Sequence, residues 1–353
     1  MNSKISQLKR QANQFQDHNP KKMQLFNQAL QLAQQQQNLK EEYDIRLQIV
    51  ETATFSGHQE KIFPHFGWCV SQYEQHSDQL SLNKLLWKYK YVLESAGKFH
   101  TITREQIDHM HKMMEKHYQQ GGYSMRPVLR MLGETRYFLG EQDKSLDLLQ
   151  QGLGHRRDRY ADCQACEITA TVRLLTVNGQ YQQALELAEP IMNGDLGCAE
   201  VPHLTYTDVL PALMALGHEE VAQQCLERGY RLINDNPGFI AQVGMQIKHC
   251  AKYGLIDAAL KRFELHLDWW LGNHCHWDQF EFELGVAKLF SVIDSEEVLS
   301  LNLPQAFELF DENSQYRVGD LLDYFQNKLV ANAKAFDQRN GNGYFSERAA
   351  ELI

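Results

Sequence analysis

The sequence predicts an all-α fold, an α-solenoid in which antiparallel helix pairs stack one after another. Its clearest unit is the stretch 168–191, where two apolar runs at helical spacing are separated by Asn178-Gly179. Glycine ends helices readily because it adopts a positive φ without steric cost. Comparable glycines recur every 37–43 residues, at Gly57, Gly97, Gly140, Gly179, Gly217 and Gly254. A repeat of this length indicates a helical array, and such arrays usually hold another macromolecule.

Length and composition are those of a folded protein: 353 residues, 43% hydrophobic and 23% charged. No apolar window of about 18 residues occurs, and the first ten residues lack the apolar core of a signal peptide. The seven cysteines are scattered along the chain, as small buried thiols are in a reducing compartment. We therefore expect a cytoplasmic protein without a membrane partner.

The net charge of −10 is unevenly distributed. Residues 1–40 hold six basic residues and one acidic residue, a balance of +5, so the remainder carries −15. Acidic residues cluster again between Asp278 and Asp323. An acidic body argues against general binding to a nucleic-acid backbone, which needs a basic surface.

Three segments can be placed on the sequence. Residues 1–38 form a Gln-rich helical segment, either a cap or a separate arm, and residues 39–272 form an array of about six helix pairs. Residues 273–353 contain a degenerate repeat and C-terminal capping helices. Thr103-Arg-Glu-Gln106 has the form of a capping box, which predicts a helix start. The helices expected in the last segment are Trp277–Ile293, Leu303–Phe310, 318–336 and 345–353.

The residues around the turn glycines resemble the tetratricopeptide repeat family. The small and aromatic positions at which that family's helices touch are matched by Leu132-Gly133, Gly179-Gln-Tyr181-Gln-Gln-Ala184, Gly217 with Ala222, and Gly254 with Ala259 and Phe263. The resemblance covers residues 40–272 and concerns packing positions. It implies a right-handed superhelix with a concave face that binds protein or peptide. The period is longer than the family's 34 residues, and the lysine–asparagine pairing that clamps a terminal carboxylate in some members is missing.

Candidate chemistry is sparse. Cys163-Gln-Ala-Cys166 is a single C-x-x-C without a second pair at zinc-ribbon spacing, so we expect packing thiols. His109 and His111 project from opposite sides of a helix, and His274-Cys-His276 lacks a further anchor. No phosphate-binding glycine loop or H-E-x-x-H motif occurs. The sequence therefore predicts no catalytic, cofactor or metal site, and a protein that is not an enzyme.

The first helix of each pair is expected to line a concave, basic and aromatic groove. Such a groove suits an acidic protein segment, because guanidinium groups bind carboxylates and aromatic faces act as anchors. The predicted groove residues are Lys84, Trp87, Lys88, Tyr91, Arg130, Glu134, Tyr137, Arg173, Thr176, Asp208, Met214, Lys248 and Lys252.

The leading hypothesis is thus a non-catalytic cytoplasmic scaffold that binds a protein or peptide. One alternative is a peptide-sensing bacterial regulator in which residues 1–37 are the effector arm. Another is an immunity or inhibitor protein whose acidic surface masks a toxic enzyme. Nucleic acid is an unlikely partner in the scaffold hypothesis, and the oligomeric state is left open.

Overall fold

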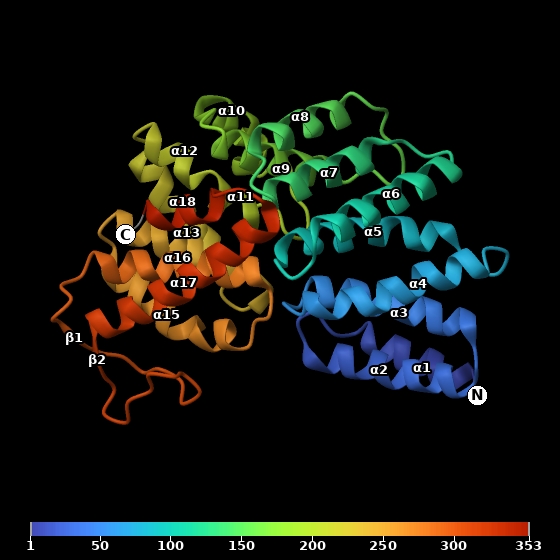
Figure 1. Cartoon of the computed structure of the whole chain (residues 1–353), viewed down its shortest axis with the longest axis horizontal. Coiled ribbons are helices and arrows are strands. Elements are labelled where there is room, and N and C mark those ends of the chain that lie inside the picture. Colours follow the sequence, from blue (N-terminus) through green and yellow to red (C-terminus); the bar gives the residue numbers. More distant parts are fainter. Residues whose placement is uncertain (1, 352–353) are drawn as a thin grey trace.

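The chain forms a curved row of helix pairs, which a computed structural model describes over residues 2–351 (Figure 1). The all-α prediction is confirmed, because helices dominate the element order. Within residues 2–351 the only β-strands are β1 (Val298–Ser300) and β2 (Gln315–Arg317), which pair in antiparallel orientation. In the same range no helix combines the length and the apolar character needed to cross a bilayer.

The first two helices pack onto the start of the array. Ile5 and Phe26 are fully buried with Ile45 and Ile49 in one apolar cluster. Pro20 is the first residue of its helix, where its missing N–H costs little. The packing is that of a cap rather than a detached arm. These helices are α1 (Asn2–Ala12) and α2 (Pro20–Gln35), and they cover α3 (Leu39–Thr54).

Six helix pairs follow one another along the row. The first helix of the fifth pair is divided into two short helices, because Pro211 lies directly after the break between them. The pairs are α3 with α4 (Ile62–Gln75), α5 (Leu82–Lys98) with α6 (Arg104–Gln120), α7 (Arg126–Phe138) with α8 (Gln142–Leu153), α9 (Gln164–Val177) with α10 (Tyr181–Met192), α11 (His203–Asp208) and α12 (Leu210–Ala215) with α13 (Glu219–Ile233), and α14 (Ile240–Lys252) with α15 (Ile256–Leu271). Two 3₁₀ turns, η1 (Gln59–Lys61) and η2 (Pro237–Phe239), precede α4 and α14.

Most of the predicted turn glycines end a helix, but one does not. Gly57, Gly140, Gly179, Gly217 and Gly254 have φ between +72° and +76°. Gly97 lies inside α5 instead, so its assignment as a turn residue was wrong. The turn of that pair is made by the connection 99–103, and the predicted capping box of Thr103 and Gln106 is present. Five of the six glycines therefore mark the repeat.

The last part of the chain covers the end of the array. α16 (His276–Ser291) is buried against α14, and the predicted C-terminal helices form α17 (Val318–Asn340) and α18 (Tyr344–Ala350). The prediction of a helix over Leu303–Phe310 was wrong. That stretch consists of separate turns in the connection between β1 and β2. Phe307 is nevertheless buried against α17 through Tyr324 and Phe325, so its apolar pattern reflects core packing without a helix.

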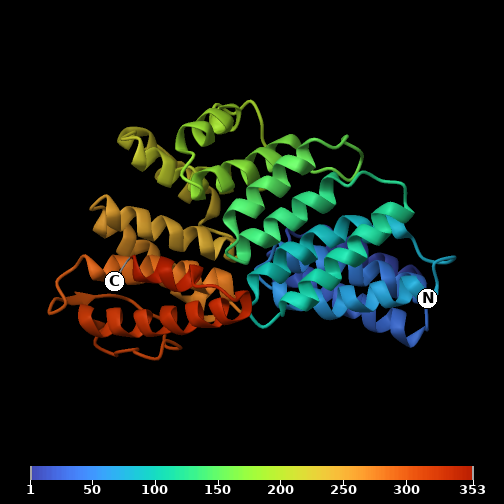
Figure 2. The same ribbon diagram turned by 45° about the horizontal axis from the view of Figure 1, so that its top comes forward.

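The row closes on itself at two places, and Figure 2 shows one of them, where the red end of α17 lies beside the teal end of α5. The turn at Gly57 meets η2, because a Cβ on Gly57 would lie 3.4 Å from the backbone carbonyl of Pro237. The end of α17 meets the connection after α5, where Arg339 donates to the carbonyl oxygens of Gly97 at 2.9 Å and Phe99 at 3.0 Å. The first helices of the pairs consequently face a partly open cavity rather than a long groove.

Candidate functional site

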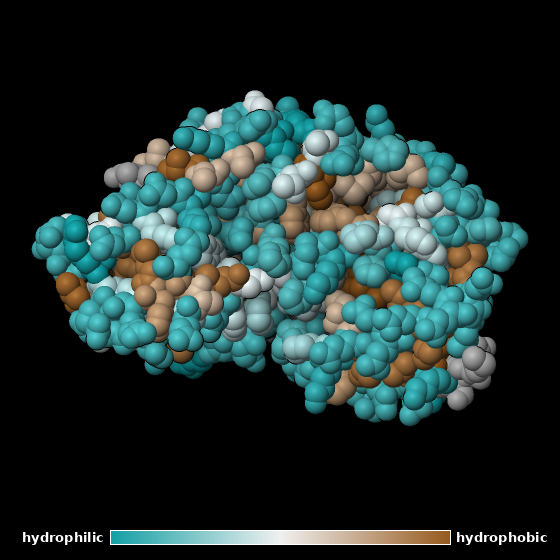
Figure 3. All heavy atoms as spheres, turned by 60° about the horizontal axis from the view of Figure 1, so that its bottom comes forward, coloured by the Kyte–Doolittle hydropathy of each residue, from teal (hydrophilic) through white to brown (hydrophobic). Residues whose placement is uncertain are grey.

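A cavity of about 450 Å³ lies on the inner side of the row. The first helix of every pair contributes to its wall: α3, α5, α7, α9, α11 and α14. The segment 198–200, η2 and the start of α16 complete it. The outer surface is mainly hydrophilic, with a notch between the N-terminal part on the right and the C-terminal part on the left (Figure 3).

Helical spacing explains how α5 presents one face to the cavity. Trp87, Tyr91, Glu94 and Lys98 are three or four residues apart, which places them on one side of a helix. Lys90 lies beside them with its Nζ 3.1 Å from the centroid of the Trp87 ring. The aromatic residues of the wall are Phe55, Trp87, Tyr91, Phe138, Phe239 and Trp277.

Four cations line the cavity, and each of them is already in an ion pair. Arg130 lies between Asp162 and Glu134, with Nη2 2.9 Å from the Glu134 carboxylate. Glu134 and Asp208 also contact Arg173, at 3.6 and 3.3 Å. The remaining pairs are Lys90 with Asp162 at 2.8 Å and Lys98 with Glu94 at 3.0 Å. A guanidinium whose charge is balanced by two carboxylates attracts an anionic partner less strongly than a free one does.

Burial and pairing set the pKa values of this network. Burial alone would lower the pKa of the Arg130 guanidinium, but Asp162 and Glu134 outweigh it and raise that pKa. Burial lowers the pKa of Lys90 to about 8, with Asp162 opposing the change. Burial also raises the pKa of Asp208 to about 6 despite Arg173. Removing one partner from such a buried network typically costs about 3–5 kcal/mol, because a charge is left uncompensated.

Two carboxyl groups of the cavity wall are in no ion pair among residues 2–351, Glu200 and Asp278. Asp278 is 2% exposed, and its Oδ2 is buried without a hydrogen-bond partner. Burial raises the pKa of Asp278 to about 6, with the Lys98 ammonium opposing that change. Burial, helped by the charge of Glu94, raises the pKa of Glu200 to about 7. The wall therefore has unmatched acidic groups and no unmatched cation.

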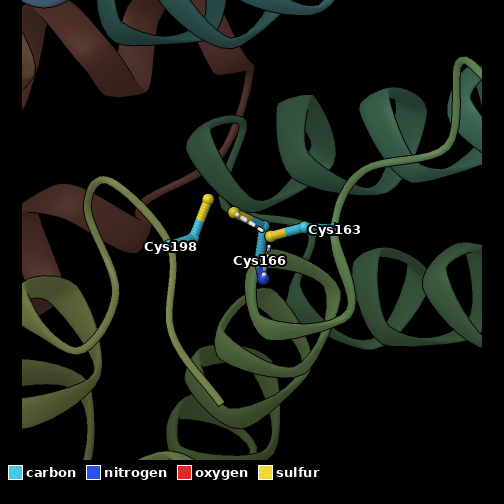
Figure 4. Close-up of side chains that lie close together, drawn as sticks. All are labelled: Cys163, Cys166 and Cys198. Carbon is cyan, nitrogen blue, oxygen red and sulfur yellow. Dashed lines mark hydrogen bonds between the residues drawn. The ribbon is translucent and has the colours of Figure 1, made fainter.

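Three cysteines from two segments meet at one side of the same cavity (Figure 4). Cys163 and Cys166 come from the start of α9, and Cys198 comes from the connection after α10. Of the C-x-x-C pair, Cys163 is exposed and Cys166 is half-buried, so Cys163 is not the packing thiol that the sequence predicts; Cys198 is exposed as well. His109 and His111 do lie on opposite sides of α6, one exposed and one buried.

The predicted groove residues fall into separate groups. Trp87, Tyr91, Arg130, Arg173 and Asp208 line the cavity. Behind it, Glu134, Tyr137 and Thr176 are buried, with Glu134 bridging the two arginines. Met214 contacts the ring of His249 at 3.0 Å.

The predicted lysines lie elsewhere. Lys84 and Lys88 border a shallower depression of about 390 Å³ and pair with Asp44 and Glu51, both at 2.6 Å. Lys248 and Lys252 on α14 are not among the cavity residues, and Lys252 is exposed. The lysines therefore do not form one surface with the arginines.

Sequence reasoning missed six of the nine charged residues that line the cavity. Lys90, Glu94 and Lys98 were detectable in principle, because they lie within a turn of Trp87 and Tyr91 on the same helix. Glu200 and Cys198 carry no such signal, because they belong to an irregular connection. Only the path of that connection across the cavity brings them to the site.

The fold and the cavity together define an all-α helical-repeat protein with a charged, partly open cavity on the inner side of the row. No protein-family model matches the chain, and no curated protein matches it either. The resemblance to the tetratricopeptide family and the predicted domain boundaries consequently stay predictions.

Proposed function

We propose that this chain is a binding protein whose cavity receives a positively charged group from a peptide or protein partner. The main support for this proposal is the unequal pairing of charges in the cavity wall. Every cation there has a carboxylate partner, whereas Glu200 and Asp278 have no ion-pair partner among residues 2–351. An unpaired carboxylate is costly where it is buried, as Asp278 is, and less so where it is half-buried, as Glu200 is; an ammonium or guanidinium group brought by a ligand removes that cost.

The size of the cavity limits what it can hold. A volume of about 450 Å³ is within the range of pockets for small ligands and is too small for a complete helix. It suits a single lysine or arginine side chain, or the amino end of a peptide. Trp277 and Tyr91 add aromatic surface, which attracts cations through the negative face of the ring.

The predicted acidic partner receives less support from this geometry. Arg130 and Arg173, the two arginines expected to bind carboxylates, are each held by two carboxylates of the chain itself. An acidic segment would have to displace them. The charge pattern therefore favours a partner of the opposite sign.

Binding, not catalysis, is our proposal for the cavity, and it rests on the unpaired carboxyl groups of Glu200 and Asp278. We also place the protein in the cytoplasm, a proposal favoured by its free cysteines. The regulator hypothesis needs a mobile effector arm, and the packing of α1 and α2 on α3 disfavours one. The immunity hypothesis has no observation in its favour beyond the acidic charge.

The proposal is tested by calorimetric titration with two short peptides, trilysine and triglutamate. Trilysine is expected to bind the wild-type chain and triglutamate is not. Glu200→Gln and Asp278→Asn should each weaken trilysine binding at least about 10-fold, or roughly 1.4 kcal/mol. Glu312→Gln is the matched control, because Glu312 is exposed and remote from the cavity wall. Preference for triglutamate, or equal binding by all variants, would contradict the proposal.

A further inference from the structure

The sulfur atoms of Cys163, Cys166 and Cys198 converge at the cavity wall. Their Sγ atoms all lie within 4.8 Å of one another, and those of Cys163 and Cys166 are 3.2 Å apart. Figure 4 shows the three sulfur atoms side by side, two from the start of α9 and one from the connection after α10, with that of Cys166 between the other two. This is the only such group of metal-ligating residues found within the part of the chain that the structure describes.

Packing does not account for this arrangement. The other four cysteines, Cys69, Cys225, Cys250 and Cys275, are buried within apolar clusters or between helices. Cys163 and Cys198, in contrast, are exposed at the cavity, where a thiol gains little from apolar contact. Cys198 also comes from a segment separate in sequence, so its position beside the C-x-x-C pair is a product of the fold.

The start of α9 favours a thiolate. Cys163 occupies the N-cap position, where the backbone N–H of Cys166 donates to its Sγ at 3.3 Å. The positive end of a helix stabilises negative charge at this position.

We propose that Cys163, Cys166 and Cys198 bind one Zn²⁺ ion through three thiolates, with a fourth position open to the cavity. Zn–S bonds of about 2.3 Å in tetrahedral geometry place sulfur atoms about 3.8 Å apart. The observed separations, from 3.2 Å to at most 4.8 Å, bracket that value, so small side-chain rotations suffice. Binding releases the thiol protons to solvent and involves no change of oxidation state.

One Zn²⁺ with three thiolates carries a net charge of −1. Asp162, directly before Cys163, is paired with Lys90 and Arg130, so its carboxylate adds no uncompensated charge beside this complex. The inference does not depend on the proposed cationic ligand.

Cobalt substitution tests the site directly. The full-length, reduced chain is titrated with Co²⁺ without oxygen, and thiolate-to-cobalt charge-transfer absorption is followed. We expect saturation at one ion per chain and loss of the absorption when Zn²⁺ is added. Zn²⁺ should also raise the thermal midpoint of the wild type, because it binds only the folded state tightly.

Two serine variants and one control complete the experiment. Cys198→Ser removes the sulfur from the separate segment, and Cys163→Ser removes another while keeping a good helix cap. Both thiols are exposed, so both variants should fold, as judged by circular dichroism. Each should weaken Co²⁺ binding by roughly 10-fold or more, whereas Cys225→Ala, far from the cluster, should bind normally. A reduced wild-type chain that takes up neither metal, or serine variants that bind like the wild type, would overturn the proposal.

Discussion

At the scale of single residues, Glu283 illustrates how burial controls protonation in this protein. Its side chain is enclosed in α16 and only 4% of the residue is exposed. Asn332 donates to its carboxylate at 3.3 Å, but no ion pair within residues 2–351 includes it. Burial therefore dominates and raises the pKa of Glu283 to about 8. The neutral acid is the form that the fold accommodates.

Glu283→Gln should change the pH dependence of stability. Because the folded pKa of Glu283 is raised, its neutral form stabilises the protein fully below the unfolded pKa near 4.5, and that contribution is lost as the pH rises toward about 8. Glutamine does not ionise, so the variant should gain on the order of 2 kcal/mol relative to wild type between pH 5 and pH 8. Denaturant unfolding at both pH values measures this difference.

The exposed Glu297 provides the control for this prediction, since Glu297→Gln should leave the pH profile unchanged. Parallel profiles for the wild type and Glu283→Gln would show that Glu283 is ionised in the folded protein at neutral pH.

At the scale of elements, small residues determine how closely the helices approach. The first helices of neighbouring pairs meet at Gly97, where an added Cβ would lie 2.7 Å from Cδ2 of the Phe138 ring. α14 and α16 meet even more tightly, because a Cβ on Gly285 would lie 2.0 Å from the carbonyl oxygen of Gly244. Gly97 is therefore a packing residue of α5, although its spacing in the sequence is that of a turn residue.

Gly97→Ala should destabilise the chain by about 1–3 kcal/mol, because the methyl group overlaps Phe138 and the α5–α7 contact must open. Gly67→Ala is the matched control. Gly67 is exposed in α4 with nothing within 4 Å of an added Cβ, so alanine should stabilise by up to about 1 kcal/mol through helix propensity. Denaturant unfolding of both variants distinguishes the two effects, and similar stabilities would contradict the overlap.

At the scale of the whole molecule, closure of the row creates the cavity. Arg339 joins the end of α17 to the far end of α5 and α7 through four backbone carbonyls, those of Gly97, Phe99, Ile102 and Phe138. These carbonyls are about 200 or more residues away in sequence. Asn342 adds a bond of 2.8 Å to the carbonyl oxygen of Leu139.

Arg339→Ala should loosen this closure. The substitution leaves several carbonyls without their donor, which we expect to cost about 2–4 kcal/mol. Hydrogen exchange should become faster in the segment 97–103 and at the end of α17. Lys334→Ala on the exposed side of the same helix is the control and should leave exchange unchanged. Unaltered protection of segment 97–103 in Arg339→Ala would show that other contacts hold the row closed.

By itself, the sequence determined the all-α class, the turn glycines at five positions and the capping box at Thr103, because these depend on local periodicity and local hydrogen bonds. The local sequence pattern was misleading at Gly97 and at Leu303–Phe310. Contacts with distant segments explain these residues, because Gly97 packs against Phe138 and Phe307 packs against Tyr324. The tertiary structure alone decided that the inner side of the row holds a partly open cavity, that its arginines are neutralised by the chain's own carboxylates, and that Cys198 lies beside the C-x-x-C pair. Each of these results requires segments distant in sequence to meet, and one helix period carries no information about which segments those are.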